Sequence, residues 1–411
     1  MRSLVLSITF LFFTPLVVGQ TKGKKTILNV GIYSWLPEAG YAIEKLERAF
    51  EQQYPEIDAN FRLVDPYSDG DSSDEFSSLA DLKQFDVFEI DAVRLDELVG
   101  GKYGGIEKIP AGVAGQPNTY IAGASTLKSE SKGQYIIPHW VCGNFLVQWS
   151  KNSHDMSSFE KIKELLNAID LPLFADLYGT GTLGEYYADA VLDIYGHEVA
   201  KKHLIGLYTG DTTSLLPVAE NRVLALINEM PVTFRDHLSK YHDLPSIYPR
   251  SFADHPNSCL IGYSERMYYV EQELQFSPST GYVPIIKADE LVVQQFPFSS
   301  TSQGTPTWVD GFVIPQGKLA KKEDAITKFL NFIQTKAGYL PFVKPRKWGP
   351  ASNLLPAVQS MYNELEEEAP LLKTFLHVFD ASFPIYDEKL YEGVKLAGKQ
   401  LKAKTKQIFS E

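Results

Sequence analysis

Cys142 is the residue of this sequence best suited to covalent chemistry. It lies in the segment PHWVCGNF (138–145), among aromatic and apolar residues, and is one of two cysteines in 411 residues. A thiolate is a strong nucleophile, so Cys142 is a candidate for covalent catalysis. Two other interpretations stay open at this point: a buried core cysteine, and one half of a disulfide with Cys259 in an oxidising compartment.

Three acidic residues occupy positions from which a side chain could act on a ligand. Asp91 ends the segment FDVFEID (85–91), Asp310 lies within TWVDGFVIP (307–315), and Glu265 belongs to GYSERM (262–267). A buried acid needs a partner, so each aspartate is either structural or ligand-binding, and Asp86 competes with Asp91 for such a role. For Glu265 the simpler interpretation is a residue at a helix start, where the helix dipole favours a carboxylate.

Alternating strands and helices must position these residues. Apolar alternation predicts a strand over 26–33, and helical spacing of apolar residues predicts a helix over 38–53. Residues 135–149 are β-rich, and 259–274 predict a short strand that leads into a helix. Such alternation indicates an α/β fold with mostly parallel sheets. A chain of this length favours two lobes, and binding sites favour the cleft between lobes.

The charge of the chain limits the classes of ligand. There are 39 Lys and Arg against 51 Asp and Glu, for a formal net charge of −12. This acidity disfavours nucleic acids and anionic membranes and would attract a cation, although it also serves simply to keep an exported protein in solution.

No metal site is predicted. The eight histidines are scattered, and the sequence contains neither a CxxC nor an HExxH motif. Residues 179–181 (GTG) lead into a predicted helix and could cradle an anion, although the same pattern is common where any helix starts.

Residues 1–19 (MRSLVLSITFLFFTPLVVG) are typical of an export signal. Arg2 supplies the positive start, an apolar core follows, and Gly19 suits cleavage before Gln20. The apolar run is too short for a comfortable membrane span. We therefore expect a protein that is secreted, or periplasmic or lumenal, and is not held in a membrane.

The order of the predicted elements resembles the type 2 periplasmic solute-binding protein superfamily. The resemblance rests on NVGIY (29–33), FDVFEID, YIIPHWV (135–141), TWVDGFVIP and DAITKFLNFI (324–333), and it covers nearly the whole mature chain. It implies two discontinuous lobes, 26–138 with 306–340 and 139–305 with 341–411, with a ligand cleft between them. It also implies hinge crossings near residues 135–146 and 300–312.

Within that superfamily, the segments PHWVCGNFL (138–146) and GYSERM resemble the thiaminase I family of enzymes. The resemblance implies base exchange on thiamine, with Cys142 as the nucleophile that attacks the pyrimidine. It implies that Glu265 is the base that removes the thiol proton and later deprotonates the incoming amine or thiol. The thiazole leaves, and an amine or thiol co-substrate takes the pyrimidine. The resemblance implies no cofactor and no metal, and we expect a monomer.

Five further residues are candidates for substrate binding. Asp91 and Asp310 could bond the pyrimidine or face the thiazolium charge, while Tyr33, Tyr67 and Tyr263 could stack on either ring. The simpler interpretation of each tyrosine is core packing, because the chain has 22 of them. The alternative function, from another class, is a non-catalytic secreted solute-binding protein for thiamine or another cationic small molecule.

Overall fold

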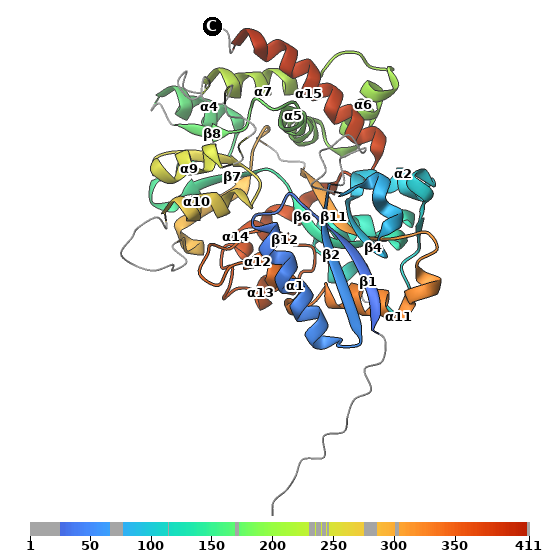
Figure 1. Ribbon diagram of the computed structural model, residues 1–411. Helices are drawn as coiled ribbons and strands as arrows, with labels where there is room; N and C mark the ends of the chain where they lie inside the picture. Colours follow the sequence, from blue (N-terminus) through green and yellow to red (C-terminus); the bar gives the residue numbers. More distant parts are fainter. Residues whose placement is uncertain are drawn as a thin grey trace, which may run out of the picture.

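The computed structural model describes residues 25–65, 77–113, 115–168, 172–229, 246–274, 286–300 and 304–408, with three single residues between 230 and 245. Two sheets organise these residues, each covered by helices, and they divide the protein into two lobes (Figure 1). We call the half built on the nine-stranded sheet the first lobe, and the half built on the four-stranded sheet the second lobe.

The first sheet has the strand order β12-β6-β11-β4-β1-β2-β3, and β5 and β13 also pair with β11. Its strands are β1 (Thr26–Tyr33), β2 (Ile57–Asp65), β3 (Ser77–Ser78), β4 (Val87–Asp91), β5 (Ile106–Glu107), β6 (Ile137–Cys142), β11 (Thr305–Pro315), β12 (Leu355–Pro356) and β13 (Ser382–Pro384). The second sheet has the order β10-β7-β9-β8. Its strands are β7 (Phe145–Trp149), β8 (Leu173–Ala175), β9 (Cys259–Gly262) and β10 (Leu291–Gln295).

Helices cover both sheets. Around the first sheet lie α1 (Ala39–Gln53), α2 (Leu95–Val99), α3 (Ala122–Ser129), α11 (Leu319–Phe332), α12 (Lys336–Val343), α13 (Met361–Glu364) and α14 (Leu372–Leu376). Around the second sheet lie α4 (Phe159–Ala168), α5 (Thr180–Tyr195), α6 (His197–Thr209), α7 (Pro217–Glu229), α9 (Ile247–Asp254), α10 (Arg266–Leu274) and α15 (Glu388–Ile408).

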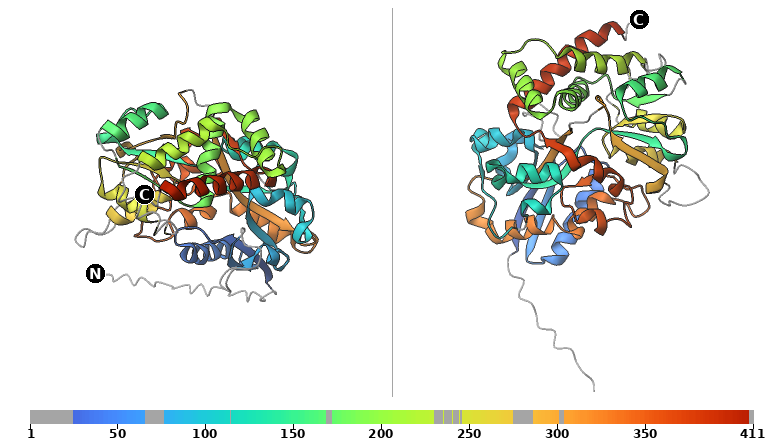
Figure 2. Two further views of the ribbon diagram at one scale, coloured as in Figure 1. Left: turned by 90° about the horizontal axis from the view of Figure 1, so that it is seen from above. Right: turned by 180° about the vertical axis from the view of Figure 1, so that it is seen from behind.

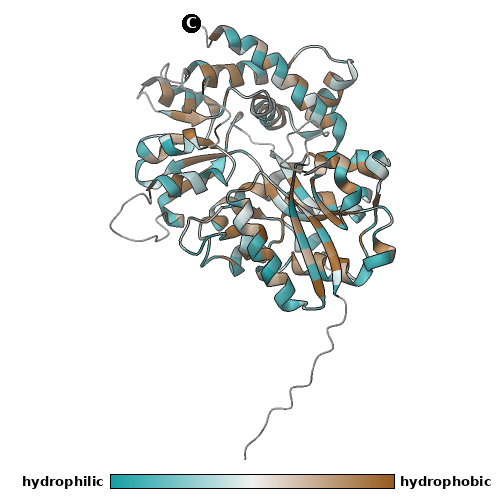
Figure 3. Ribbon diagram, in the orientation of Figure 1, coloured by the Kyte–Doolittle hydropathy of each residue, from teal (hydrophilic) through white to brown (hydrophobic). Residues whose placement is uncertain are grey.

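Apolar periodicity explains how the first lobe forms its core. Helix α1 buries Ala42, Leu46 and Phe50 on one stripe, at the spacing that places residues on one helix face. The Phe50 ring meets the rings of Phe329 and Phe332 on α11 edge to face, at centroid distances of 5.6 and 5.3 Å. In Figure 3, brown hydrophobic and teal hydrophilic stretches share the strands β1 and β2 and the helix α1, as expected for elements with one buried face.

The expectation of mostly parallel sheets was wrong, because both sheets are mixed. Five strand pairings are parallel and six are antiparallel among the described strands. The long strand β11 causes much of the difference, since it returns from the second lobe and runs antiparallel to both β4 and β6. The order of strands and helices along the sequence does not reveal the direction in which a strand such as β11 runs when the chain comes back to the first sheet.

The chain crosses between the sheets at three places. It leaves the first sheet between β6 and β7, returns between β10 and β11, and leaves again after β13 to form α15. The first two crossings lie where the sequence analysis expected hinges. The lobe boundaries stay a prediction, although β12 pairs with β6 in the first sheet, which favours joining residues 341–384 to the first lobe.

The last helix, α15, completes the second lobe. It packs against α5, α6 and α7, and the views in Figure 2 show it in red beside these green helices. Two glycines allow the backbone of α15 to approach the backbones of α6 and α5 closely. Gly393 faces the carbonyl of Leu204 on α6 and Gly398 faces the carbonyl of Thr180 on α5, where any Cβ would clash. In the part of the chain described, no helix is both long enough and apolar enough to span a membrane.

Candidate active site

A cavity of about 570 Å³ opens between the two lobes. Both lobes contribute to its walls, the first mainly through β6, β11 and the segment after β1, and the second through α5 and the loop between β9 and α10. Its lining residues are Tyr33–Pro37, Trp140–Cys142, Asp176, Glu185, Tyr248, Tyr263–Arg266, Tyr269, Trp308, Asp310, Leu354, Leu355 and Tyr391. A ligand in this cavity would therefore contact both lobes.

Strand register places Cys142 beside the two predicted aspartates. Cys142 at the end of β6 lies opposite Trp308 of β11, and Trp140 lies opposite Asp310. Asp310 in turn lies opposite Asp91 of β4. Directly opposed residues of antiparallel strands point to the same face of a sheet, so all five side chains share the face that borders the cavity.

A β-bulge in β6 sets this register. The pairing with β11 shifts between Asp310 and Gly311, which leaves His139 as an extra residue on β6. His139 is fully buried, and its Nδ1 lies 2.6 Å from Oε1 of Glu89. The other carboxylate oxygen of Glu89 accepts the backbone N–H of Tyr33 at 2.9 Å. The buried pair thus ties β6, β4 and the end of β1 together beneath the cavity.

The thiol of Cys142 is half-buried and protonated at rest. Burial raises the pKa of Cys142 well above its usual value, and the carboxyl groups of Asp310, Glu265, Asp91 and Glu185 raise it further where they are ionised. The thiol donates a weak hydrogen bond to the carbonyl of Trp308, at 3.9 Å. Because a thiol attacks only as the thiolate, this site needs a base to remove the proton.

Glu265 can serve as such a base. It lies in the loop between β9 and α10 and lines the cavity from the second lobe. Burial raises its pKa, while the charge of Arg266 and a hydrogen bond from its own backbone N–H oppose the rise. Its charge also raises the pKa of Cys142, so the two groups interact electrostatically within one cavity.

The opposed carboxyls of Asp91 and Asp310 cannot both ionise easily. Burial raises the pKa of Asp310 strongly, and the charges of Asp91, Glu89 and Glu265 add to the rise. Asp91 is held differently, because its Oδ1 accepts the backbone N–H of Val93 at 2.9 Å. Asp310 is therefore a neutral acid that can donate a hydrogen bond to a ligand.

The structure also places the remaining candidates. Tyr33 and Tyr263 line the cavity, whereas Tyr67 lies outside the described residues. Asp91 is not part of the lining and reaches the site through Asp310. The disulfide interpretation was wrong, because both cysteines are free and Cys259 is buried in the second sheet.

The sequence analysis missed the second-lobe acids of the cavity. Glu185 on α5 accepts a hydrogen bond from the hydroxyl of Tyr263, and Asp176 precedes the same helix. Oδ1 of Asp176 accepts the backbone N–H groups of Tyr178 and Gly179, both at 3.2 Å. The acid Asp176 thus accepts backbone N–H groups at the start of α5, which favours the interpretation of the GTG turn as an ordinary helix start over a site for an external anion.

No pattern in the sequence distinguished Asp176 or Glu185, but helix α5 carries a further acid, Asp189, on its buried face. Asp189, one turn beyond Glu185, is buried and accepts hydrogen bonds from Asn144 at 2.9 Å and Thr305 at 3.1 Å. Both donors lie at the interlobe crossings. Helix α5 thus carries one acid to the cavity and another to the hinge. Across the described residues, no group of three or more His, Cys, Asp or Glu is arranged to hold a metal ion.

Comparison with known proteins supports this architecture. The sequence matches no known family profile and no curated protein. Among solved structures it is similar to Clostridium botulinum thiaminase I in complex with thiamin, with a TM-score of 0.68 at 19% identity over 93% of this chain and 100% of the other. It is also similar to thiaminase I from Bacillus thiaminolyticus, with a TM-score of 0.68 at 16% identity over 92% and 99%.

The GacH receptor of Streptomyces glaucescens is similar as well, with a TM-score of 0.63 at 14% identity over 92% of this chain and 94% of the receptor. The chain has the two-lobed α/β fold of the type 2 periplasmic binding proteins. At these identities the likeness shows the fold alone. That fold is shared by enzymes and by receptors, so function must be argued from the site.

Proposed function

We propose that this protein is a thiamine-degrading base-exchange enzyme, a transferase of the pyrimidinylmethyl group. One observation carries the proposal: Cys142 and Glu265, which are 123 residues apart in sequence, line the same cavity from opposite lobes. A receptor for a small solute has no need of a thiol and a base with raised pKa in one cavity.

The proposed reaction begins when Glu265 takes the thiol proton of Cys142 and the thiolate adds to the pyrimidine ring. A C–S bond forms at the ring carbon next to nitrogen. Asp310, as a neutral acid, donates a hydrogen bond to a ring nitrogen and so stabilises the charge that develops there. The bond between the bridging methylene and the thiazolium nitrogen breaks, and the thiazole leaves with the electron pair as a neutral molecule.

The second stage transfers the pyrimidine. An amine or thiol adds to the methylene carbon and loses one proton, the C–S bond breaks, and the thiolate takes its proton back from Glu265. The free enzyme is regenerated, so the two stages form a ping-pong cycle. No step draws on a group other than the side chains of this cavity and its two substrates.

The charge of the cavity suits a cationic substrate. Four lining residues are acidic, of which Asp310 is held neutral, whereas Arg266 is the one basic residue of the described lining. The tyrosine rings of the wall can face a thiazolium, and a cation over an aromatic face gains roughly 0.5–2 kcal/mol. Acidity and aromatic rings together favour thiamine over the neutral sugars bound by many proteins of this fold.

A second candidate function is a non-catalytic solute-binding protein for thiamine or another cation. It is favoured by the raised pKa of Cys142, which leaves little thiolate in the resting protein, and by the fold shared with the GacH receptor. In this alternative, the acidic and aromatic walls would bind the same cation without breaking a bond.

Incubation with thiamine and aniline separates the two functions. The enzyme produces free thiazole and a pyrimidine–aniline adduct, both of which mass spectrometry detects, whereas a binding protein returns intact thiamine. Cys142→Ser should abolish adduct formation and still bind thiamine. The matched control, Cys259→Ser, removes the other thiol and should keep the activity, because Cys259 is buried in the second sheet away from the cavity lining.

Export and oligomeric state complete the proposal. We expect secretion after cleavage near Gly19, although the signal segment lies outside the described residues. We also expect a monomer, since each chain brings both walls of its own cavity.

A further inference from the structure

Glu185 stands on the second-lobe wall of the cavity and has no part in the scheme above. It lies in the second turn of α5, is half-buried, and lines the cavity. Its carboxylate accepts a hydrogen bond from the hydroxyl of Tyr263, which itself lies two residues before Glu265. The acid is thus fixed to the loop that carries the first base.

The balance of protons in the exchange calls for a second base. During the first stage Glu265 takes one proton, that of the Cys142 thiol, and the thiazole leaves without one. When a primary amine then adds to the methylene carbon, its nitrogen becomes positively charged and must lose a proton. While Glu265 keeps the thiol proton for the departing thiolate, it cannot also take the amine proton. In that case the deprotonation of the amine, which the sequence resemblance assigned to Glu265, falls to another base of the cavity.

We propose that Glu185 is a second general base of this cavity, which accepts the proton released by an amine co-substrate as the amine takes the pyrimidine. The inference rests on the proposed function and adds a residue to it. The C–N bond to the amine forms as the C–S bond breaks, Glu265 reprotonates the thiolate of Cys142, and the amine proton passes to Glu185 and then to water.

The electrostatic setting of Glu185 supports this role. Burial raises its pKa to about 7, the hydrogen bond from Tyr263 opposes the rise, and the nearby charges are those of Asp176, Arg266 and Asp91. A base is most effective when its pKa lies near the working pH. Glu185 is therefore ionised often enough to accept a proton near neutral pH.

The other cavity acids are less suited to the task. The pKa of Asp310 is raised so strongly, by burial and by the charge of Asp91, that Asp310 stays protonated. Asp176 is engaged by the backbone N–H groups of Tyr178 and Gly179 at the start of α5. Glu185 is the lining acid left with both a suitable pKa and a place on the wall.

A pair of co-substrates tests the proposal directly. Aniline carries N–H protons and must lose one after it attacks, whereas pyridine has none to lose and forms a pyridinium product. We would measure kcat/KM for each co-substrate, together with the first-turnover release of thiazole, in the wild type, Glu185→Gln, Asp176→Asn and Glu198→Gln. Glu198→Gln is the matched control. It makes the same change of side chain, but Glu198 lies on the surface of α6, with a side chain that is 92% exposed.

The expected result is selective. Glu185→Gln should lower kcat/KM for aniline by about 10²- to 10⁴-fold, the usual contribution of a general base, and change that for pyridine less than about threefold. Thiazole release in the first turnover should be unchanged, and Glu198→Gln should match the wild type throughout. Glutamine can still accept the hydroxyl of Tyr263, so this contact is kept.

Three results would overturn the assignment. Equal loss of the aniline and pyridine reactions means that Glu185 supports the structure of the site and not a proton transfer. No loss of either means that it takes no part. An aniline-selective loss in Asp176→Asn but not in Glu185→Gln gives the role to Asp176. If the wild type forms neither adduct, the proposed function itself fails, and this outcome is distinct from the other three.

Discussion

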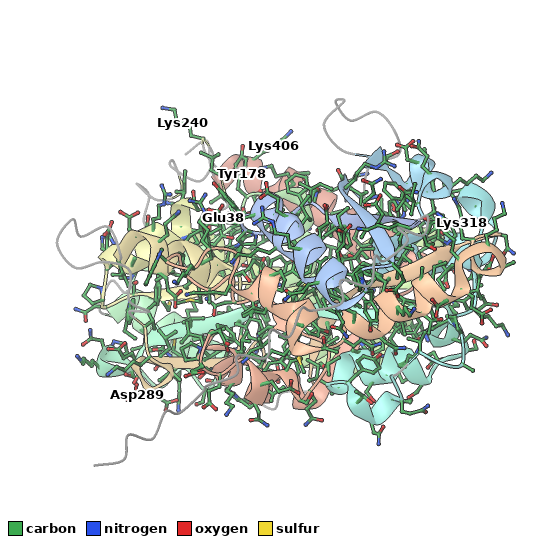
Figure 4. The ribbon with its side chains drawn as sticks, turned by 60° about the horizontal axis from the view of Figure 1, so that its bottom comes forward. Glu38, Tyr178, Lys240, Asp289, Lys318 and Lys406 are labelled. Carbon is green, nitrogen blue, oxygen red and sulfur yellow. The ribbon has the colours of Figure 1, made fainter. Side chains whose placement is uncertain are left out.

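A hydrogen bond between the lobes should control closure of the cavity. The hydroxyl of Tyr268 on α10 donates to Oε1 of Glu38 at 2.7 Å, across the gap between the second and the first lobe. Glu38 precedes α1, where Figure 4 labels it, and its other oxygen accepts from Arg346 of the first lobe at 2.8 Å. Glu38 has a left-handed backbone (φ 59°), a conformation that costs energy outside glycine and so needs support from such contacts.

The size of the effect follows from this geometry. A hydrogen bond to a charged group contributes roughly 1.5–3 kcal/mol when it is well buried. Tyr268 is buried, but the Glu38 carboxylate keeps its second partner, Arg346, whose side chain is 50% exposed. We therefore expect Tyr268→Phe to disfavour the closed form by about 1 kcal/mol, which is roughly a fivefold change in the closed-to-open ratio.

Two measurements check this expectation. Calorimetric titration with thiamine, made in the Cys142→Ser background to prevent turnover, should show Tyr268→Phe binding more weakly, by at most about fivefold. Small-angle scattering of the unliganded variant should show a larger radius of gyration. Tyr208→Phe on α6 is the control, because Tyr208 is exposed and away from the cavity. Unchanged scattering together with unchanged affinity would refute the view that this bond holds the lobes closed.

Three further predictions follow from the site. Glu265→Gln should slow first-turnover release of thiazole by about 10²- to 10⁴-fold and leave thiamine binding intact; normal release measured by stopped flow would exclude Glu265 as the base. The ratio of the aniline rate to the pyridine rate should fall as the pH drops through about 7, because protonated Glu185 cannot accept the amine proton; a flat ratio would contradict this. Burial raises the pKa of Asp189 to about 7, above its unfolded value, so its protonated form stabilises the fold at low pH and this contribution is lost as the pH rises from about 4 to about 7. Because the asparagine of Asp189→Asn cannot ionise, the Tm of this variant should rise relative to that of the wild type between about pH 4 and about pH 7. A constant difference in Tm, measured by calorimetry, would contradict a raised pKa of Asp189.

Local patterns in the sequence predicted local structure well. The alternation in 26–33 corresponds to β1, and the apolar stripe in 38–53 corresponds to α1, because period and burial are set by neighbouring residues. Cys142 and Glu265 could be paired only through the resemblance of their segments to a known family. Nothing in the spacing of the two residues indicates that they share a cavity.

Features that depend on distant parts of the chain could not be predicted in this way. The antiparallel return of β11 and the bulge at His139 arise from strand pairing, and pairing partners are not evident from either strand alone. The same holds for Glu185, which reads as an ordinary polar residue of a helix until the fold brings it to Tyr263. Contacts between lobes, such as that of Glu38 with Tyr268, carry no local signal at all.

Covalent attachment of the substrate to Cys142 tests the central proposal most directly. The protein would be mixed with thiamine in the absence of any amine or thiol co-substrate, quenched in acid, and analysed by intact-mass spectrometry and peptide mapping. We predict a gain in mass equal to the pyrimidinylmethyl group less the thiol hydrogen that it replaces, located on the peptide that contains Cys142 and absent from Cys142→Ser. An unmodified Cys142 peptide beside free thiazole in solution, or intact thiamine and no adduct, would contradict the proposed mechanism.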